Sequence, residues 1–500
     1  MNCMSGKHYL PTVIFASLLL LATSAQADIS DSPWGDAADF VAPANSDSQI
    51  TYGPPGCPIV VVNRDAWHVK SKRIVQTLPA DVEIGKTRCL SSNGRYFAAY
   101  NGEWHDRGKS VNVWDLVSGE KVAEIPGSQQ RVYTVLQMMR NRYLIAANDS
   151  DASCLVWDVE ENRKVRELPT RVGRIAQGQL SVSPDGQFLA LVEGDKVPVM
   201  KLAESRYLGS LVSPFQDPTD TRYRANLNAD NIKDMAFSPD GKEIAAIYQT
   251  TDKQRLIVWD GVGQIQFDIP VNIYWGRLNS QSLTWLPNKK GWIVDGNVIH
   301  RDSKKIVTQV KRDRYAEDKI GALDEYYMIG RFGQAADSIS VIGIPWEEIE
   351  RSIGAMTSAE NPIIGPGIQV SIMVYMRGQT GPSIETARAA IGDALVARLA
   401  EDQMTFAPDQ EAYFRFNAEP ASVDHPFGIL KLELLVKGSD TPIWSHEFAE
   451  TDSKSFLKGL DSGSISETAV VQLKREINLL QIPYFIPRTA DFIPLPMVIQ

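Results

Sequence analysis

The chain has 500 residues, of which 43% are hydrophobic and 22% charged, and its formal net charge is -10. Such a length supports two or three cores, and the composition is ordinary for globular protein, which excludes the disordered and collagen-like classes. The acidic balance argues against nucleic acid and anionic membrane surfaces as partners, because both are bound mainly through clustered Lys and Arg.

The amino terminus has the pattern of an export signal. Lys7 precedes an apolar run over residues 13–22, and Ala25-Gln26-Ala27 is a small-x-small cleavage sequence. We therefore predict a signal peptide over residues 1–27, cleaved after Ala27, and a periplasmic or secreted protein. Cleavage removes Lys7 and no acid, which changes the net charge from -10 to -11. No later run reaches the roughly 18 apolar residues of a membrane span.

Three cysteines remain after cleavage: Cys57, Cys89 and Cys154. An oxidising compartment permits a disulfide between Cys57 and Cys89 with one spare thiol, but three unpaired and mostly buried thiols are equally compatible with the sequence. The cysteines lack the close-paired spacing of zinc ligands. We expect no metal site and no cofactor.

Residues 28–56 have no apolar period and are expected to form a flexible lead-in, whereas short alternating apolar runs separated by turn signals follow from about 59 to 346. Three of these runs end in Trp-Asp, at Trp114-Asp115, Trp157-Asp158 and Trp259-Asp260. Tight-turn sequences precede them, at Ser91-Ser92-Asn93-Gly94, Ser183-Pro184-Asp185-Gly186 and Ser238-Pro239-Asp240-Gly241. Each such turn joins two antiparallel strands, so the repeating unit has four strands.

This pattern resembles the WD-repeat β-propeller family over residues 59–346. Aligned third strands place seven residues at equivalent positions, with separations of 51, 43, 43, 59, 41 and 43 residues: Asn63, Trp114, Trp157, Met200, Trp259, His300 and Gly343. An insertion near residues 213–226 accounts for the long step. Seven third strands favour seven blades over residues 57–350, although a composite closing blade and six in total stay open. The resemblance makes the three Trp-Asp pairs structural, and the lack of any Gly-His pair implies blades held mainly by apolar packing.

A different pattern follows a predicted linker at 351–367. Strict alternation over 368–376 predicts a strand, and apolar residues every three or four positions from Ile384 to Leu399 predict a helix capped by Ser383. Strands are expected near 411–417, 428–436 and 442–449, and a last helix carries Val470, Leu473, Ile477 and Leu480 on one face. Residues 368–500 should therefore form a β-α-β-β-β-α domain with its helices on one face of the sheet.

The chain contains none of the standard catalytic motifs that would place a nucleophile, a phosphate loop or a metal-binding His pair. We therefore do not expect an enzyme. A polar loop in the second predicted blade, Glu103-Trp104-His105-Asp106-Arg107, clusters an aromatic side chain with both charges, and Asp149 and Asp151 follow in the next blade. The ordinary interpretation is solvated loops. The functional interpretation is a binding face formed by Trp104, His105, Asp106, Arg107, Asp149 and Asp151.

Together these features predict an exported binding or scaffold protein with a protein or other macromolecular partner, an expectation that rests on family resemblance because fold alone does not dictate function. The alternative is a propeller hydrolase or lyase with its site in the central channel.

Overall fold

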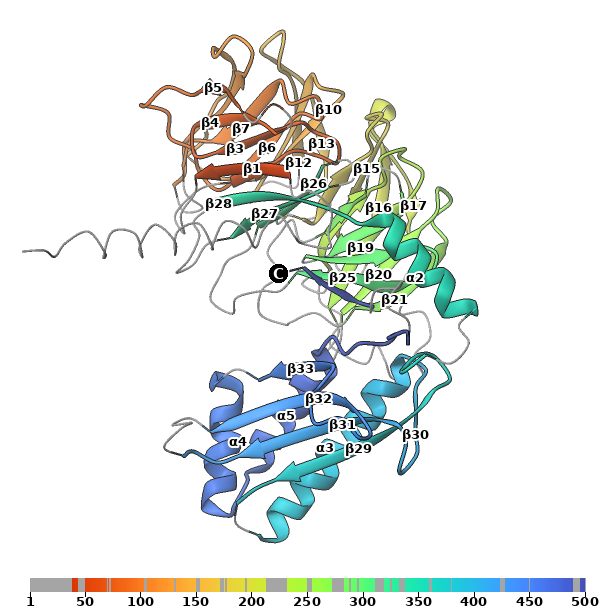
Figure 1. Ribbon diagram of the computed structural model, residues 1–500. Helices are drawn as coiled ribbons and strands as arrows, with labels where there is room; N and C mark the ends of the chain where they lie inside the picture. Colours follow the sequence, from red (N-terminus) through yellow and green to blue (C-terminus); the bar gives the residue numbers. More distant parts are fainter. Residues whose placement is uncertain are drawn as a thin grey trace, which may run out of the picture.

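The computed structural model describes residues 38–43, 50–69, 71, 73–102, 106–129, 132–149, 153–170, 175, 178–193, 196–212, 232–249, 254–271, 283–286, 289–294, 296–310, 319–323, 326–331, 338–358, 362–378, 380–422, 428–448, 450–488 and 495–499. They form a β-propeller and a smaller domain that lies below it in Figure 1. The predicted signal sequence and the insertion at 213–226 lie outside the described residues.

Six antiparallel sheets of the propeller are each built from four consecutive strands, which we call blades 1 to 6. Blade 1 contains β2 (Ile50–Tyr52), β3 (Ile59–Val62), β4 (Asp65–His68) and β5 (Arg73–Thr77). Blade 2 contains β6 (Arg88–Leu90), β7 (Tyr96–Tyr100), β8 (Val111–Asp115) and β9 (Lys121–Ile125). Blade 3 contains β10 (Tyr133–Met139), β11 (Tyr143–Asn148), β12 (Ser153–Asp158) and β13 (Arg163–Pro169).

The next three blades repeat this order. Blade 4 contains β14 (Leu180–Val182), β15 (Phe188–Leu191), β16 (Pro198–Lys201) and β17 (Arg206–Ser210). Blade 5 contains β18 (Ile232–Phe237), β19 (Ile244–Gln249), β20 (Gln254–Trp259) and β21 (Ile265–Val271). Blade 6 contains β22 (Leu283–Trp285), β23 (Gly291–Val294), β24 (Asn297–His300) and β25 (Lys305–Val310), with β34 (Met497–Ile499) as a fifth strand.

A seventh sheet closes the ring and is composite. It joins β26 (Lys319–Leu323), β27 (Tyr326–Arg331) and β28 (Ser338–Gly343) to β1 (Ala38–Pro43) from the other end of the chain. The first strand of each blade contacts the first strand of the next, and β26 contacts both β22 and β2, so the circle is complete. Residues 28–56, expected to be a flexible lead-in, thus contribute β1 to this blade 7 and β2 to blade 1.

The tight turns fold alike in three blades. In each, the serine hydroxyl accepts a hydrogen bond from the backbone N–H five residues further on, at 2.8 Å for Ser91, 2.9 Å for Ser183 and 3.0 Å for Ser238. The glycine three positions later has a φ between +64° and +72°, a region that glycine tolerates at no steric cost. These sequences join the first and second strands of their blades, as the sequence predicts.

Three of the seven predicted third-strand positions differ in the structure. Asn63 lies in the turn between β3 and β4 with φ +56°, and Trp67 pairs across β4 and β5 as Trp114 pairs across β8 and β9. The same register places Ile299 at the Trp position of blade 6. In blade 7, Gly343 lies opposite Tyr326, so the Trp position lies one residue before Gly343. Repeat spacing alone could not resolve these shifts because loop lengths differ between blades.

The tryptophans of the Trp-Asp pairs pack between neighbouring blades, but to unequal depth. Trp114 and Trp259 are 2% and 0% exposed, whereas Trp157 is half-buried at the border of the cluster between blades 2 and 3. Each aspartate accepts a hydrogen bond from the backbone N–H two residues further on, at 2.9–3.1 Å.

Two of these aspartates also bind arginine. The guanidinium of Arg95 donates two hydrogen bonds to Asp115, at 2.9 and 2.7 Å, and Arg142 donates two to Asp158, at 3.0 and 2.6 Å. Burial alone would raise the pKa of each carboxyl, but these charge-assisted bonds and the turn amides lower it below its usual value. The expectation that apolar packing mainly holds the blades is therefore incomplete.

The carboxyl-terminal domain has the sheet order β30-β29-β31-β32-β33. Its strands are β29 (Gln369–Met376), β30 (Thr405–Phe406), β31 (Ala412–Glu419), β32 (Ile429–Val436) and β33 (Trp444–Glu447). Three helices accompany them: α3 (Pro382–Glu401), α4 (Glu450–Ser462) and α5 (Glu467–Leu479). The predicted β-α-β-β-β-α order holds, with β30 and α4 added. Gly381, not Ser383, is the N-cap of α3, because Pro382 already occupies the first helical turn.

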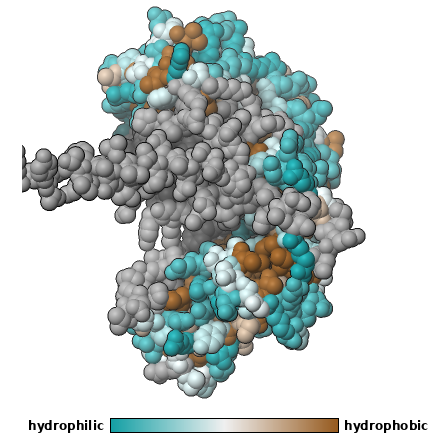
Figure 2. All heavy atoms as spheres, in the orientation of Figure 1, coloured by the Kyte–Doolittle hydropathy of each residue, from teal (hydrophilic) through white to brown (hydrophobic). Residues whose placement is uncertain are grey.

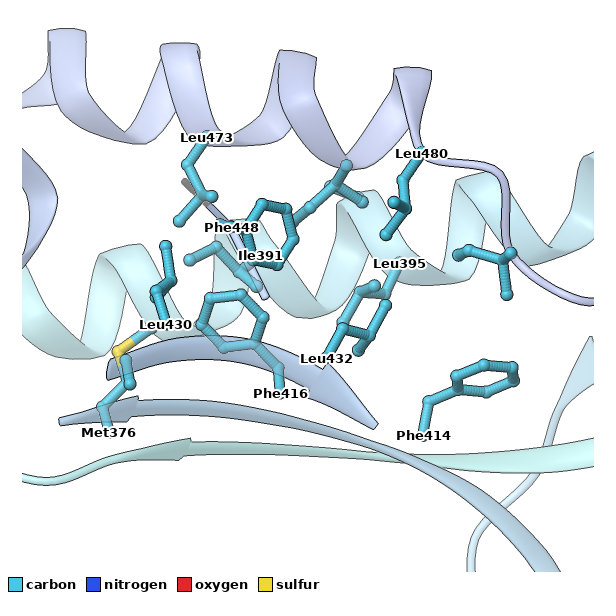
Figure 3. Close-up of a cluster of buried hydrophobic side chains, with 14 of the residues drawn as sticks. Met376, Ile391, Leu395, Phe414, Phe416, Leu430, Leu432, Phe448, Leu473 and Leu480 are labelled. Carbon is cyan, nitrogen blue, oxygen red and sulfur yellow. The ribbon is translucent and has the colours of Figure 1, made fainter. Parts of the chain in front are cut away.

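The core of this domain lies between the sheet and its helices, as Figure 3 shows. Phe414, Phe416 and Leu432 point from the strands toward Leu395 of α3 and Leu473 of α5. The helices thus cover one face of the sheet, as the apolar periodicity predicts.

The two domains are joined by more than one connection. Residues 351–358 of the predicted linker form the second half of α2 (Trp346–Ser358), which packs on blade 6. The chain then returns from the carboxyl-terminal domain, where Tyr484 and Phe485 join the same cluster and β34 pairs in parallel with β25. In Figure 1 this last strand lies beside β25, close to the C mark.

Candidate functional site

A cavity of about 610 Å³ opens between blades 1 and 2, and we call it the groove. The loop from β5 to β6 and the loop from β7 to β8 form most of it, so it lies where blade-to-blade connections and the loops between second and third strands meet. Its lining residues are Asn63, Arg64, Ala80, Asp81, Val82, Glu83, Ile84, Gly85, Asn101, Gly102 and Asp106.

Backbone hydrogen bonds fix the floor of the groove. The Gly85 N–H donates to the Tyr100 carbonyl at 2.9 Å, and the Tyr100 hydroxyl donates to the Asp106 carbonyl. A Cβ atom at Gly85 would lie 2.3 Å from the Gly102 carbonyl oxygen, so only glycine allows the two loops to approach this closely. The groove is therefore held in shape by the propeller.

The lining of the groove is acidic. Asp81, Glu83 and Asp106 contribute three carboxylates, and the Arg64 guanidinium is directed to the Val82 carbonyl at 3.2 Å. Lys109 lies 3.6 Å from Glu83, with both side chains exposed, so this pair is weak in water. The arrangement suits a partner that presents cationic or amide donors.

A second cavity of about 330 Å³ adjoins the groove and shares Asp81, Val82, Glu83 and Asn101 with it. The buried Asn101 Oδ1 atom accepts no hydrogen bond from the described part of the chain. A buried acceptor without a partner is uncommon in native proteins.

The predicted binding residues fall into three groups. Asp106 lines the groove, whereas Arg107 and Asp149 form an ion pair of 3.0 Å that links a loop of blade 2 to a loop of blade 3. Asp149 also accepts a hydrogen bond from the Val132 N–H at 3.0 Å. Trp104, His105 and Asp151 lie outside the described residues. The structure thus places Asp106 in the cavity and gives Arg107 and Asp149 a cross-blade contact.

Sequence reasoning missed the loop that contributes most to the groove. Residues 78–87 carry no motif, and only their position between two predicted blades pointed to the same face as the loop of Asp106. The Asp81-Val82-Glu83 sequence was the available signal, since two acids flank a valine where no core position is needed.

The described cysteines and His446 have the properties of packing residues rather than of reactive groups. Within the described part of the chain, Cys57, Cys89 and Cys154 are all unpaired, which is the second of the two arrangements left open by the sequence. Burial raises the pKa of the Cys57 thiol to about 11 and that of Cys154 to about 12, so both stay protonated at neutral pH. Burial lowers the pKa of His446, which stacks on Trp444, to about 4. Among the described residues no group of three or more His, Cys, Asp or Glu side chains is arranged to hold a metal ion.

The chain has little similarity to known proteins beyond its fold. No family model matches the chain, and no curated protein matches it. Among solved structures, a chain from the "Complex of KlAtg21 with coiled-coil of AgAtg16" is similar, at 15% identity and a TM-score of 0.41, covering 63% of this chain and 96% of that chain. At this TM-score the likeness supports no inference about function. None of the described helices is long and apolar enough to cross a membrane.

Proposed function

We propose that this protein is a binding scaffold whose groove between blades 1 and 2 holds a segment of a protein partner. The observation that carries the proposal is the rigid acidic cavity of about 610 Å³, built by loops from two blades. A preformed concave site with a few polar groups is the usual form of a binding site. Its carboxylates favour a basic peptide segment and disfavour the phosphates of nucleic acid.

Membership in the WD-repeat family, with degenerate repeats, is part of the proposal. Its support is that Trp114-Asp115, Trp157-Asp158 and Trp259-Asp260 end the third strands of three blades and cap the turns that follow. Blade 1 has Trp67-His68 at this position, and the remaining blades carry other residues there. A binding role without catalysis follows from the lack of catalytic motifs in the sequence.

Export is also proposed, on the strength of Lys7, the apolar run at 13–22 and Ala25-Gln26-Ala27. The mature protein should begin at Asp28. Amino-terminal sequencing or intact mass of the protein from its native source checks this, and retention of residues 1–27 would show that the segment is not cleaved.

The scaffold proposal is tested by charge reversal in the groove. The double variant Asp81→Lys and Glu83→Lys should bind the native partner at least tenfold more weakly, with an unchanged melting temperature, because both side chains are exposed. Asp440→Lys is the control, since Asp440 is an exposed acid in the turn between β32 and β33 and lines neither cavity.

Affinity capture from the native envelope or medium, quantified by mass spectrometry, compares the three proteins. A partner recovered by the wild type and Asp440→Lys but lost by the double variant supports the groove. Equal recovery by all three proteins would contradict it.

A further inference from the structure

Blades 1 and 6 have nearly the same outer half. By strand register, Arg73-Ile74-Val75-Gln76-Thr77 of β5 is equivalent to Lys305-Ile306-Val307-Thr308-Gln309 of β25. In both blades, as in blades 2 to 5, one extra residue interrupts the pairing with the third strand at the same place, and this residue is Val75 in β5 and Val307 in β25. The two outer strands therefore have the same local shape.

The turns that lead into these strands are also alike. His68 Nδ1 accepts a hydrogen bond from the Ser71 N–H at 3.1 Å, and His300 Nδ1 accepts one from the Ser303 N–H at 3.2 Å. Histidine thus replaces the aspartate of the Trp-Asp pairs in both blades. No other described blade ends its third strand with histidine.

In blade 6 this outer surface is covered by the rest of the chain. Val307 is 0% exposed in a cluster with Trp346 and Ile349 of α2 and with Phe485. Lys305 forms an ion pair of 2.8 Å with Asp402 of the carboxyl-terminal domain.

Backbone groups of β25 are covered as well. The Ile306 carbonyl accepts a hydrogen bond of 2.7 Å from the Tyr484 hydroxyl, and β34 pairs in parallel with the second half of β25, residues 308–310. Blade 6 therefore shows what binds a strand of this kind: a parallel strand, an apolar cover and a carboxylate.

In blade 1 the equivalent surface is open. Ile74 and Val75 are 45% and 46% exposed, and β5 is the last strand of its sheet. The Arg73 side chain, which corresponds to Lys305, forms no ion pair with the described residues. Figure 2 shows brown surface on the part of the propeller where Figure 1 labels β4 and β5.

Single exposed apolar residues are common on protein surfaces and need no explanation. The outer strand of blade 3 is such a case, because Val165, 39% exposed, is flanked by Lys164 and Arg166. Charged side chains protect edge strands from pairing with other chains. The strand β5 has only Arg73 at one end, followed by two adjacent exposed apolar residues.

We propose that β5 is a docking surface for an extended, apolar segment of a partner protein, which adds a parallel strand to blade 1 and places a carboxylate near Arg73. The covered surface of blade 6 is the template, since the same residues in the same register are bound there in this way. Main-chain pairing would supply affinity and the side chains specificity. This surface lies on the propeller rim and is independent of the groove.

The probe is a fluorescent peptide with the sequence of residues 495–500, whose residues 497–499 pair with β25, preceded by one aspartate. The full-length protein should bind one peptide, seen by fluorescence anisotropy, and amide exchange should slow over residues 73–77. Val75→Glu should weaken binding at least tenfold. Val262→Glu is the matched control, because Val262 is 81% exposed in the turn between β20 and β21 of blade 5.

The charge of the probe tests the role of Arg73. Replacing the added aspartate with lysine should weaken binding to the wild type, and Arg73→Glu should reverse this preference. Absence of saturable binding at millimolar peptide, equal binding by Val75→Glu, or slowed exchange over residues 305–310 instead of 73–77 would each overturn the proposal. Groove variants should bind the peptide normally, so failure of one proposal is separable from failure of the other.

Discussion

Trp259 and Trp157 occupy equivalent positions in two blades, but their surroundings differ. Trp259 is 0% exposed and its indole N–H donates to the Val212 carbonyl at 2.8 Å, whereas half-buried Trp157 donates to Asn162 at 3.2 Å. The family resemblance assigned the same structural role to the tryptophans of all three Trp-Asp pairs. In the structure Trp259 is the more deeply buried of these two.

Trp259→Ala should destabilise the propeller by about 3–5 kcal/mol, because it leaves a large cavity between blades 4 and 5. Trp157→Ala should cost roughly 1–2 kcal/mol, since part of the ring already contacts water. Urea unfolding followed by far-UV circular dichroism gives both values. Equal losses of unfolding free energy in the two variants would contradict the difference in burial between the two rings.

Asp240 is a test of charge at the border of two blades. Burial alone would raise its pKa, but the Lys289 ammonium at 2.7 Å, the Ser238 hydroxyl and the Lys242 amide together lower it to about 2. A lowered pKa in the folded state contributes stability above the ordinary value of about 3.8, and this contribution is lost as pH falls toward 2.

Asp240→Asn should therefore lower the melting temperature at pH 7, and the difference from the wild type should shrink between about pH 4 and pH 2. Differential scanning fluorimetry across this range measures it. Asp461→Asn, at an exposed position on α4, should leave the melting temperature unchanged throughout. A difference for Asp240→Asn that stays constant with pH would rule out the ionic contribution.

Two glycines show where loops must approach each other closely and where they need not. Gly85 lies under the groove, where an added Cβ would meet two backbone oxygens, those of Gly102 at 2.3 Å and Tyr100 at 2.5 Å. Gly209, in the outer strand β17, has no atom within 4 Å of the same position. The two residues therefore form a matched pair.

Gly85→Ala should lower stability by roughly 1–3 kcal/mol and weaken partner binding in the groove, because the loops must separate. Gly209→Ala should be neutral or slightly stabilising, since it restricts the unfolded chain. Thermal melts of both variants, with the capture assay, provide the test. A neutral Gly85→Ala would mean that the floor of the groove adapts more readily than its hydrogen bonds suggest.

For the whole molecule, the return of the chain to blade 6 governs how the two domains melt. Tyr484 is 4% exposed, donates to the Ile306 carbonyl and packs against Lys305, whose ammonium lies 5.3 Å from the ring centre. From sequence, residues 28–350 and 363–500 should each fold alone. The first of these segments would end within α2, and the second would separate β34 from its partner strand β25. Neither boundary therefore divides the chain between its two domains.

Tyr484→Ala should uncouple the domains, so that calorimetry resolves two transitions where the wild type gives one. Tyr484→Phe should keep the ring and remove only the hydrogen bond, a loss of about 1 kcal/mol. A single transition in all three proteins would show that the connection through α2 suffices to couple the domains.

The class of both domains could be predicted from the sequence, because the patterns that define it are local. Strand alternation, the three Ser-containing turns and the three Trp-Asp pairs each depend on residues within one blade, and the period of Ile384 to Leu399 depends on one helix. The blade position of Asn63 was missed for the converse reason, since the Trp67 position depends on pairing with β5.

How the ends of the chain close the molecule depends on contacts between distant segments, which are seen only in the folded protein. The pairing of β1 with β28, the covering of Val307 by α2 and Phe485, and the groove between residues 78–85 and 101–106 each join segments that are not adjacent in sequence. Burial of an equivalent residue, such as Val75 or Val307, depends on which distant segment lies over it. Which segment covers such a residue depends on the packing of the whole chain, so no local sequence pattern predicts it.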